Sequence, residues 1–362
     1  MVGRVLHAAA QDLSRLLVLV TGAAGFIGMN LIQGMILPKA SGGGGLSPKQ
    51  VVGIDSLNTY YSKTLKVARK EILEQGGIIV HHGNLCDEEL LQRIFSSSNF
   101  THVVHLAAQA GVRYAYYKPY EYVSNNFDCF AVLLETIRKQ CPKCYLVYAS
   151  SSSVYGLNRK KPFSESDRTD MPAGFYGATK KSNELLAFSY YNTYCLHSTA
   201  LRIFTVYGRW NRPDMAAYMF THNIDKGLPI KLYEGGRMAR DFTFIDDIVS
   251  GILSACQFRS HRDANGCFRP ETFNLGNSHP VPVRDFIRFL EVILGKNATL
   301  VDAGSSPSEV EETYANISKA GALLGWAPRT GIEEGLRHLV QWYKETEGHE
   351  QFLREGDFHI ND

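Results

Sequence analysis

The sequence predicts an α/β fold with a doubly wound parallel sheet, followed by a smaller α/β region. A short apolar run, Leu16–Thr21, leads through a glycine-rich turn into an amphipathic segment at Met29–Leu37. Apolar runs and helical patterns then keep alternating as far as Ala149, which is typical of a parallel sheet with crossover helices. After about residue 205 the chain becomes less regular and richer in Pro, Gly and aromatic residues, so we expect a second region there.

Each further element of the sheet is predicted from its hydrophobic pattern. Strands are expected at Val51–Asp55, Ile78–His82, His102–Leu106 and Tyr145–Ala149, and helices at Asp87–Phe95 and Glu121–Lys139. The glycine-rich stretch Ala40–Gln50 is predicted to be a flexible surface loop rather than a domain linker, because the alternation of strands and helices resumes directly after it. We expect a first domain over 16–204, rejoined by about 240–277, a second region over about 205–239 and 278–345, and terminal extensions at 1–15 and 346–362.

Composition restricts the class of protein and its partners. With 362 residues, 44% of them hydrophobic and 20% charged, the chain fits a soluble globular protein. Its 38 basic and 36 acidic side chains show no dense basic run, so neither nucleic acid nor a membrane surface is an expected partner. The apolar run Leu16–Val20 is far shorter than the ~20 residues of a membrane span. We predict a cytoplasmic protein.

The cysteines are expected to be reduced. There are seven, an odd and scattered set that fits a reducing compartment better than a disulfide framework. Cys141 and Cys144 form a CxxC, which is predicted to be an ordinary loop between a helix and a strand; a zinc or redox site is the less favoured alternative. No metal site is predicted.

The glycine turn predicts a Rossmann-type dinucleotide site. Gly22, Gly25 and Gly28 lie between a strand and a helix, where backbone N–H groups and the helix N-terminus can approach a pyrophosphate. The second strand ends at Asp55, an acid placed to bond a ribose 2′-hydroxyl, and an acid there favours NAD over NADP. Asn84 is expected either near the adenine or as a turn residue.

A row of hydroxyls and a tyrosine–lysine pair predict proton transfer beside the cofactor. Ser150–Ser153 follow an apolar strand, and ligands of such sheets lie beyond the carboxyl ends of the strands. Tyr176 and Lys180 stand at i, i+4 on one helix face. A nearby ammonium and the positive nicotinamide ring would favour the phenolate of the tyrosine, which could then remove a proton from a substrate C–OH as hydride leaves.

Taken together, the segments HLAAQAGVRY, YASSSSVYG, YGATKKSNE, RIFTVYG, RPDM and RDFTFIDDIV resemble an extended short-chain dehydrogenase/reductase from about Leu16 to Tyr343, and within it the UDP-glucuronate 4-epimerase branch. The resemblance implies an NAD-dependent enzyme acting on a UDP-sugar, a homodimer paired through the helices carrying Asn126 and Tyr176, and a catalytic group of Ser151, Tyr176 and Lys180. It implies cofactor contacts from Gly22, Gly25, Phe26, Ile27, Gly28, Asp55, Asn84, Leu85, Leu106, Ala107, Ala108, Gln109, Asn126, Tyr176 and Lys180.

The same resemblance implies the substrate side of the site. Thr205 and Arg212 match positions that hold the uronate carboxylate, Arg240 matches the arginine that neutralises the diphosphate, and Tyr233 is expected near the uracil. Ser151, Ser152 and Ser153 are expected near the sugar, and Arg113 is expected to face the substrate without an assigned role. Arg209 and Asn211 replace the Pro and Gly usual in this loop.

The residues after Ser151 distinguish the possible reactions. Dehydrating relatives have an Asp-Glu pair there and decarboxylating relatives a Glu at the second position, whereas this chain has Ser152 and Ser153. With no carboxyl to carry a proton at C5 or C6, reversible oxidation at C4 is the favoured reading. A UDP-glucuronate decarboxylase and another UDP-sugar 4-epimerase are the enzyme alternatives. An NAD-binding redox sensor is the non-enzyme alternative, which an intact Ser151, Tyr176 and Lys180 disfavour.

Overall fold

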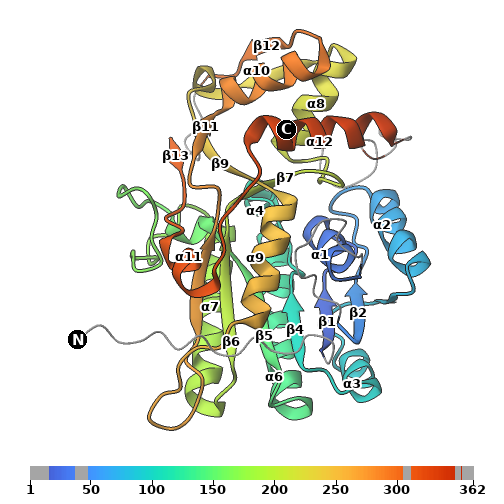
Figure 1. The fold of residues 1–362 in the computed structure, drawn as a ribbon, viewed down its shortest axis with the longest axis vertical. Coiled ribbons are helices and arrows are strands. Elements are labelled where there is room, and N and C mark those ends of the chain that lie inside the picture. Colours follow the sequence, from blue (N-terminus) through green and yellow to red (C-terminus); the bar gives the residue numbers. More distant parts are fainter. Residues whose placement is uncertain (1–15, 37–47, 305–310, 347–351, 353–362) are drawn as a thin grey trace.

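A computed structural model describes residues 16–36, 48–304, 311–346 and 352. Its centre is a seven-stranded parallel sheet in the order β10-β6-β5-β4-β1-β2-β3 (Figure 1). The strands are β1 Leu17–Thr21, β2 Gln50–Asp55, β3 Ile79–His82, β4 His102–His105, β5 Tyr145–Ser151, β6 Ser198–Ile203 and β10 Glu271–Leu275. The order reverses beside β1, so the carboxyl ends of β1 and β4 flank the crevice where ligands of such sheets bind.

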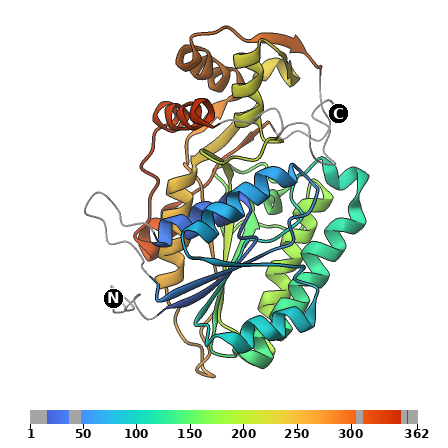
Figure 2. The ribbon, with the colours of Figure 1, turned by 90° about the vertical axis from the view of Figure 1, so that its right-hand side faces the viewer.

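Helices cover both faces of this sheet, as Figure 2 shows from the side. They are α1 Phe26–Ile36, α2 Lys63–Gln75, α3 Glu88–Ser97, α6 Cys129–Gln140, α7 Phe175–Tyr194 and α9 Ile245–Gln257. Strand β1 explains the two layers, because its side chains alternate between faces. Val18 and Val20 join the core beneath α1 and α9, whereas Leu19 joins the core beneath α3 and α6.

The second region begins with β7 and builds two small sheets away from the main one (Figure 1). One contains β7 Thr205–Tyr207, β9 Ala239–Phe244, β11 Pro280–Pro282 and β13 Glu312–Thr313, and the other pairs β8 Pro229–Leu232 with β12 Thr299–Asp302. The helices are α8 Ala216–Lys226, α10 Val283–Leu294 and α12 Ile332–Glu345, with a 3-10 turn, η4, at Tyr233–Gly236. The short helix α11 Ser318–Leu324 instead packs beside the main sheet, against β10 and α9. Between β9 and β11 the chain returns to the main sheet as β10.

The α/β fold class with a parallel sheet is confirmed, and the predicted strands match within two residues at each end. The predicted helix over Glu121–Lys139 is wrong in one respect, since it is not continuous. After α4 Tyr114–Tyr117 and α5 Pro119–Tyr122, a π-helical turn, η2, spans Val123–Asp128 before α6 begins. Hydrophobic spacing alone does not reveal a π turn, because it adds a single residue to an otherwise helical pattern.

Several predictions fall outside what the structure describes. The loop predicted at Ala40–Gln50 lies largely beyond the described residues, as do most of the terminal extensions. The division into two domains stays a prediction. In the part of the chain that is described, no helix is long and apolar enough to cross a membrane.

The expectation of unpaired cysteines is contradicted. Disulfides join Cys86 to Cys129, Cys141 to Cys144 and Cys195 to Cys267, with Cα atoms 4.4, 5.3 and 5.2 Å apart. Cys256 is buried and reduced. The CxxC does lie in the loop between α6 and β5, as predicted, but its two thiols bond each other. The cysteine argument for a reducing compartment therefore fails, and the cytoplasmic location stays a prediction.

Candidate active site

The glycine turn after β1 is built for close backbone contact. Gly22 has φ +70°, and a Cβ there would lie 2.8 Å from the Ala107 nitrogen at the end of β4. At Gly28 a Cβ would lie 2.1 Å from the Gly22 carbonyl oxygen, so only glycine lets α1 begin this near the turn. A Cβ added at Gly25 would lie 2.9 Å from the same oxygen. These absent side chains leave α1 with its N-terminus open to a cavity, as a pyrophosphate requires.

Asp55 ends β2 at the rim of this cavity. One carboxylate oxygen accepts a hydrogen bond from Ala24 N at 3.0 Å and the other from Leu57 N at 2.9 Å. Each oxygen keeps a second lone pair, so the carboxylate can also accept from a ribose hydroxyl. Asp55 therefore fixes the glycine turn as well as facing the predicted ribose position.

Most of the other predicted cofactor residues line the same cavity. They are Gly22, Gly25, Phe26, Ile27, Gly28, Asp55, Asn84, Leu85, Leu106, Ala107, Ala108, Gln109, Tyr176 and Lys180. Asn84 lines the cavity, and its side chain accepts from Cys86 N at 2.9 Å in a turn; its place near the adenine stays a prediction. Together, the glycine cradle, Asp55 and this lining fit a dinucleotide.

Asn126 does not line the cavity but fixes its wall. It lies on the π turn η2 with its side chain buried. Its amide accepts from Gln109 N at 2.7 Å and donates to Gln109 O at 3.0 Å, so it holds the strand end beyond β4 from both sides. A further bond to Thr179 Oγ1 at 3.1 Å joins this strand end to α7.

The structure brings Ser151, Tyr176 and Lys180 together on the cavity wall. Ser151 is the last residue of β5, and Tyr176 and Lys180 come from the first two turns of α7. Lys180 donates from Nζ to the Ala149 carbonyl at 2.9 Å, which places its ammonium beside the end of β5. Ser152 and Ser153 are not among the residues that line the cavity; they lie in the 3-10 turn η3, Ser152–Tyr155, where Ser153 N donates to Ser151 Oγ at 3.1 Å.

The prediction that the Lys180 ammonium and a positive nicotinamide ring together favour the Tyr176 phenolate concerns the site with NAD bound and stays a prediction. Burial raises the pKa of Tyr176, and what counteracts it is a hydrogen bond with the Ser151 side chain and the charge of Arg212. Burial lowers the pKa of Lys180 to about 8. Burial and the Lys180 ammonium lower the pKa of His105 to about 3. Without a positive ring beside it, the phenol is therefore held protonated.

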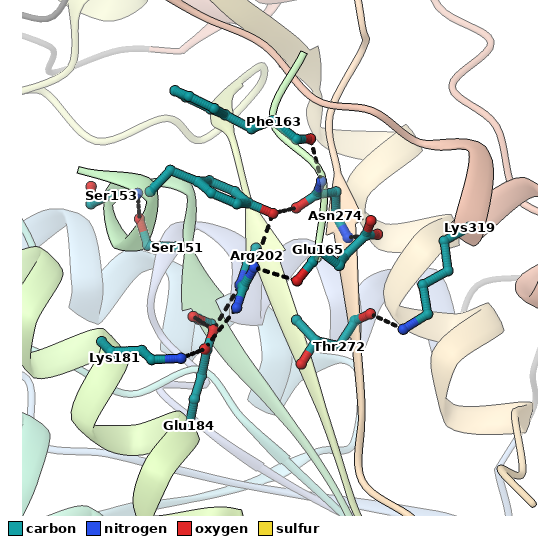
Figure 3. Close-up of polar contacts among 12 residues, drawn as sticks. Ser151, Ser153, Phe163, Glu165, Lys181, Glu184, Arg202, Thr272, Asn274 and Lys319 are labelled. Carbon is teal, nitrogen blue, oxygen red and sulfur yellow. Dashed lines mark hydrogen bonds and ion pairs between the residues drawn. The ribbon is translucent and has the colours of Figure 1, made fainter. Parts of the chain in front are cut away.

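A buried polar network stands behind the serine turn, and Figure 3 shows its members. Glu184 of α7 accepts from Ser150 Oγ at 2.8 Å and forms two bonds of 2.9 Å with Arg202 of β6. Arg202 also donates to the hydroxyl of Tyr155, which in turn donates to Asn274 Oδ1 at 2.6 Å. The helix that carries Tyr176, the turn that comes after Ser151 and strands β6 and β10 are thereby joined through one cluster.

Arg212 reaches the cavity from the loop after β7. Its guanidinium donates from Nε to Asp214 Oδ1 at 3.0 Å and from Nη2 to Asp214 Oδ2. The same group lies 5.5 Å from the ring centroid of Tyr60 and 5.7 Å from that of Tyr61. Burial alone would lower the pKa of Arg212, but the Asp214 carboxylate outweighs it and the pKa is raised.

The remaining predicted substrate residues lie outside this cavity lining. Thr205 opens β7, between Phe204 and Val206, which do line the cavity. Arg113 and Tyr233, which are 120 residues apart, meet with the guanidinium 5.1 Å from the ring centroid. Arg240 lies on β9, and its guanidinium donates to the Ala239 carbonyl at 2.9 Å.

Sequence reasoning missed a group of residues that surrounds Arg212: Tyr60, Tyr61, Lys66, Arg69 and Asp214. All but Asp214 come from the segment between β2 and α2 or from α2, an element that we did not predict. Asp214 lies inside the RPDM segment, two residues from Arg212, so its proximity was a visible signal. The tyrosines carried none, because an aromatic pair beside a strand is ordinarily read as core.

The chain was also compared with known proteins. A family profile described as GDP-mannose 4,6 dehydratase matches residues 19–339. UDP-glucuronate 4-epimerase 3 of Arabidopsis thaliana is 46% identical over 335 residues, which cover 90% of this chain and 76% of that protein. UDP-glucuronate 4-epimerase 1 of the same plant is 46% identical over 336 residues, covering 90% and 76%.

Two solved structures are similar in fold. The UDP-glucuronic acid 4-epimerase of Bacillus cereus, in complex with UDP-glucuronic acid and NAD, has a TM-score of 0.80 and 32% identity, covering 91% of this chain and 99% of that one. The UDP-glucose 4-epimerase of Thermotoga maritima, with UDP-glucose, has a TM-score of 0.78 and 27% identity, covering 92% and 100%.

Proposed function

Because the chain belongs to the GDP-mannose 4,6-dehydratase family, in the group that contains the plant UDP-glucuronate 4-epimerases, we propose that it interconverts UDP-glucuronate and UDP-galacturonate with NAD. One observation carries the proposal: Ser151, Tyr176 and Lys180 meet on a cavity lined by the glycine turn and Arg212. It is an NAD-dependent isomerase of sugar nucleotides. A redox sensor would need the glycine turn but not this proton-transfer group.

The cofactor half of the cavity would hold NAD through the glycine turn and Asp55. When bound, NAD supplies a hydride acceptor for C4 of the sugar and then returns the hydride. Asp55 disfavours NADP, because its carboxylate would repel a 2′-phosphate. The Lys180 ammonium is held at the end of β5 by the Ala149 carbonyl, so this chain places one fixed positive charge beside the reacting end of the cavity.

Tyr176 is the proposed general base, and Ser151 orients the substrate hydroxyl toward it. In the protein alone, burial keeps the pKa of Tyr176 above its ordinary value, so the phenol loses its proton only when further positive charge lies near it. This arrangement ties proton removal to an occupied site. The Ser151 hydrogen bond holds the phenol oxygen in place, which is what positioned acid–base catalysis requires.

The two residues after Ser151 set the direction of the chemistry once the sugar is oxidised. Ser152 and Ser153 offer hydroxyls and no carboxyl group in the η3 turn. Elimination of water needs a proton acceptor at C5 and a donor at C6, and neither residue type serves. We therefore favour return of the hydride to the opposite face of the 4-keto sugar over dehydration.

The proposal is tested by incubating the purified protein with UDP-glucuronate and identifying the products by chromatography. UDP-galacturonate is the expected product. A UDP-pentose with release of carbon dioxide would instead identify the decarboxylase, and conversion of UDP-glucose alone would identify another UDP-sugar epimerase. Bound NAD with no change in any UDP-sugar would support the sensor.

The substrate contacts of Thr205, Arg212, Arg240, Arg113 and Tyr233 are part of the same proposal. Arg113 and Tyr233 form one cation–π contact, and we assign them to the nucleotide end of the substrate together. Arg212 is assigned to the uronate carboxylate because a guanidinium can engage both carboxylate oxygens.

We further propose a homodimer formed by the π turn η2 and helix α7. Val123 and Phe127 of η2 and Leu185 and Phe188 of α7 are exposed, and Leu185 is 61% accessible. Apolar side chains gathered on adjacent helices are typical of a protein interface. Light scattering should give a molar mass twice that of the chain. The double variant Leu185→Lys, Phe188→Lys should have the mass of a single chain.

A further inference from the structure

The arginine proposed to clamp the substrate is already bonded to an internal carboxylate. A guanidinium carries five N–H donors on three edges. Asp214 takes the side edge, through Nε at 3.0 Å and one hydrogen of Nη2. One hydrogen of Nη1 and the second hydrogen of Nη2 form the end edge of the fork, and the pair with Asp214 uses neither of them. A carboxylate could therefore still bind the end edge while Asp214 holds the side edge.

Asp214 is itself held rigidly. Its side chain is only 5% accessible, against 17% for that of Arg212. The Tyr60 hydroxyl donates to Asp214 Oδ2 at 3.0 Å. Tyr60 in turn fits tightly against Gly111, where a Cβ would lie 2.1 Å from the tyrosine oxygen. A buried carboxylate fixed on two sides is not placed to swing aside when a substrate arrives.

The backbone of the same loop is fixed by a second arginine. Arg69 of α2, which is fully buried, donates from Nη2 to the Trp210 carbonyl at 2.7 Å. Arg212 N donates to the side chain of Asn211 at 2.8 Å. The loop therefore fixes the backbone position of Arg212, and Asp214 fixes the orientation of its guanidinium.

We propose that Asp214, held by Tyr60, is a positioning residue that fixes the fork of Arg212 so that its end edge receives the substrate carboxylate. The inference rests on the proposed function, because it takes the substrate to be a UDP-uronate. It makes recognition of the acidic sugar depend on a carboxylate, that of Asp214, which does not line the cavity. A neutral UDP-hexose makes no use of this edge, so its binding is independent of Asp214.

The test is Asp214→Asn, which keeps the side-chain volume but removes the charge and one of the two acceptors. We expect the KM for UDP-glucuronate to rise about tenfold, since the fork loses its charge-assisted partner. The inhibition constant of UDP-glucose, measured against the same substrate, should stay within about twofold of the wild-type value. Tyr60→Phe removes only the hydroxyl and should raise the KM about threefold.

A matched control is available three residues earlier. Arg209 also forms a two-bond pair with a carboxylate, that of Asp246, at 2.8 and 3.1 Å, but through the end edge of its guanidinium and on the exposed surface. Asp246→Asn should leave both constants within about twofold. Equal rises in the KM for UDP-glucuronate and the inhibition constant of UDP-glucose on Asp214→Asn would overturn the inference, as would an unchanged KM.

Two further outcomes need their own interpretation: a variant that does not fold, and a wild-type protein without activity. If Asp214→Asn does not fold, as judged by its thermal unfolding, Tyr60→Phe decides, and an unchanged KM in that variant overturns the inference. If the wild-type protein does not convert UDP-glucuronate at all, the proposed function fails first, and the inference fails with it.

Discussion

The two sides of the cavity are built from different materials. On the cofactor side, the backbone forms the surface: Gly22, Gly25 and Gly28 each bring it to within contact distance of another main-chain atom. On the substrate side, side chains form it, and Arg212 is placed by Asp214 and Tyr60. The cofactor side has no room for a side chain at these glycines, whereas the substrate side depends on the orientation of charged groups.

This difference explains what each side can recognise. Backbone N–H groups at a helix N-terminus suit a phosphate group that many ligands share. Paired charges in a buried loop can separate one sugar from another, because a wrongly oriented fork loses its bonds to a carboxylate. A variant on either side should therefore affect only the ligand of that side, and substitutions on each side can test that separation.

The largest effect is expected where the two sides meet, at Tyr176. Tyr176→Phe should bind NAD normally and lose epimerisation by a factor on the order of 10² or more, because a positioned general base is removed. NAD titration measures cofactor binding, and single-turnover assays measure the rate of epimerisation. Tyr191→Phe on the same helix, whose hydroxyl bonds Asp263 away from the cavity, is the matched control and should keep full activity. Near-normal turnover in the Tyr176 variant would contradict its role as general base.

On the substrate side, Arg212→Ala should raise the KM for UDP-glucuronate. Charge-assisted bonds contribute about 1.5–3 kcal/mol, which corresponds to roughly 10- to 150-fold. Oxidation at C4 places a ketone β to the carboxylate, so a loosely held carboxylate should also be lost as carbon dioxide. The ratio of UDP-pentose to UDP-galacturonate measures this. Arg212→Lys should restore control only in part, because it lacks the fork. Unchanged KM and no added pentose in the alanine variant would show that Arg212 does not hold the carboxylate.

On the cofactor side, Asp55→Ala should weaken NAD binding about tenfold and change the chemical step much less. The carboxylate also accepts bonds from Ala24 N and Leu57 N, so the glycine turn should loosen with it. Calorimetric titration with NAD provides the measurement. Asp87→Ala removes an exposed helix cap on α3 and should leave NAD binding unchanged. An Asp55 variant with wild-type affinity would contradict the proposed contact between Asp55 and the ribose.

The last prediction concerns stability rather than ligand binding, and it is a pH dependence expected from Lys66, which lines the cavity. Burial lowers the pKa of Lys66 to about 7, while the ordinary value is about 10.5. Below pH 7 both folded and unfolded chains carry the proton; between 7 and 10.5 only the unfolded chain does. Stability should therefore rise with pH in this window, by at most about 1.4 kcal/mol per unit.

Denaturant unfolding of the wild type and of Lys66→Met at pH 7, 8 and 9 isolates this contribution. The wild type should gain stability relative to the variant as the pH rises. Equal slopes would show that the lysine is not desolvated in the folded protein.

The same contrast explains how much could be predicted from the sequence. The glycine turn and Asp55 could be found because a backbone-built site requires glycine at fixed positions, and the apolar strands identify the sheet around it. Asp214 and Tyr60 could not be paired, because their meeting depends on the shape of the loop at Trp210, which has φ +59°. The disulfide partners Cys195 and Cys267 lie 72 residues apart and become neighbours only in the folded chain.

The π turn η2 makes the active site sensitive to chain length as well as to residue type. Val123–Asp128 accommodates one residue more than an α-helical path would, and Asn126 lies within that turn. Removing any one residue there would leave a regular α-helical path between α5 and α6, and the wide turn that now presents Asn126 would be lost. Asn126 could not then keep its two bonds to Gln109 while Cys129 stayed beside Cys86. Homologous chains should therefore tolerate substitutions across this turn more readily than insertions or deletions.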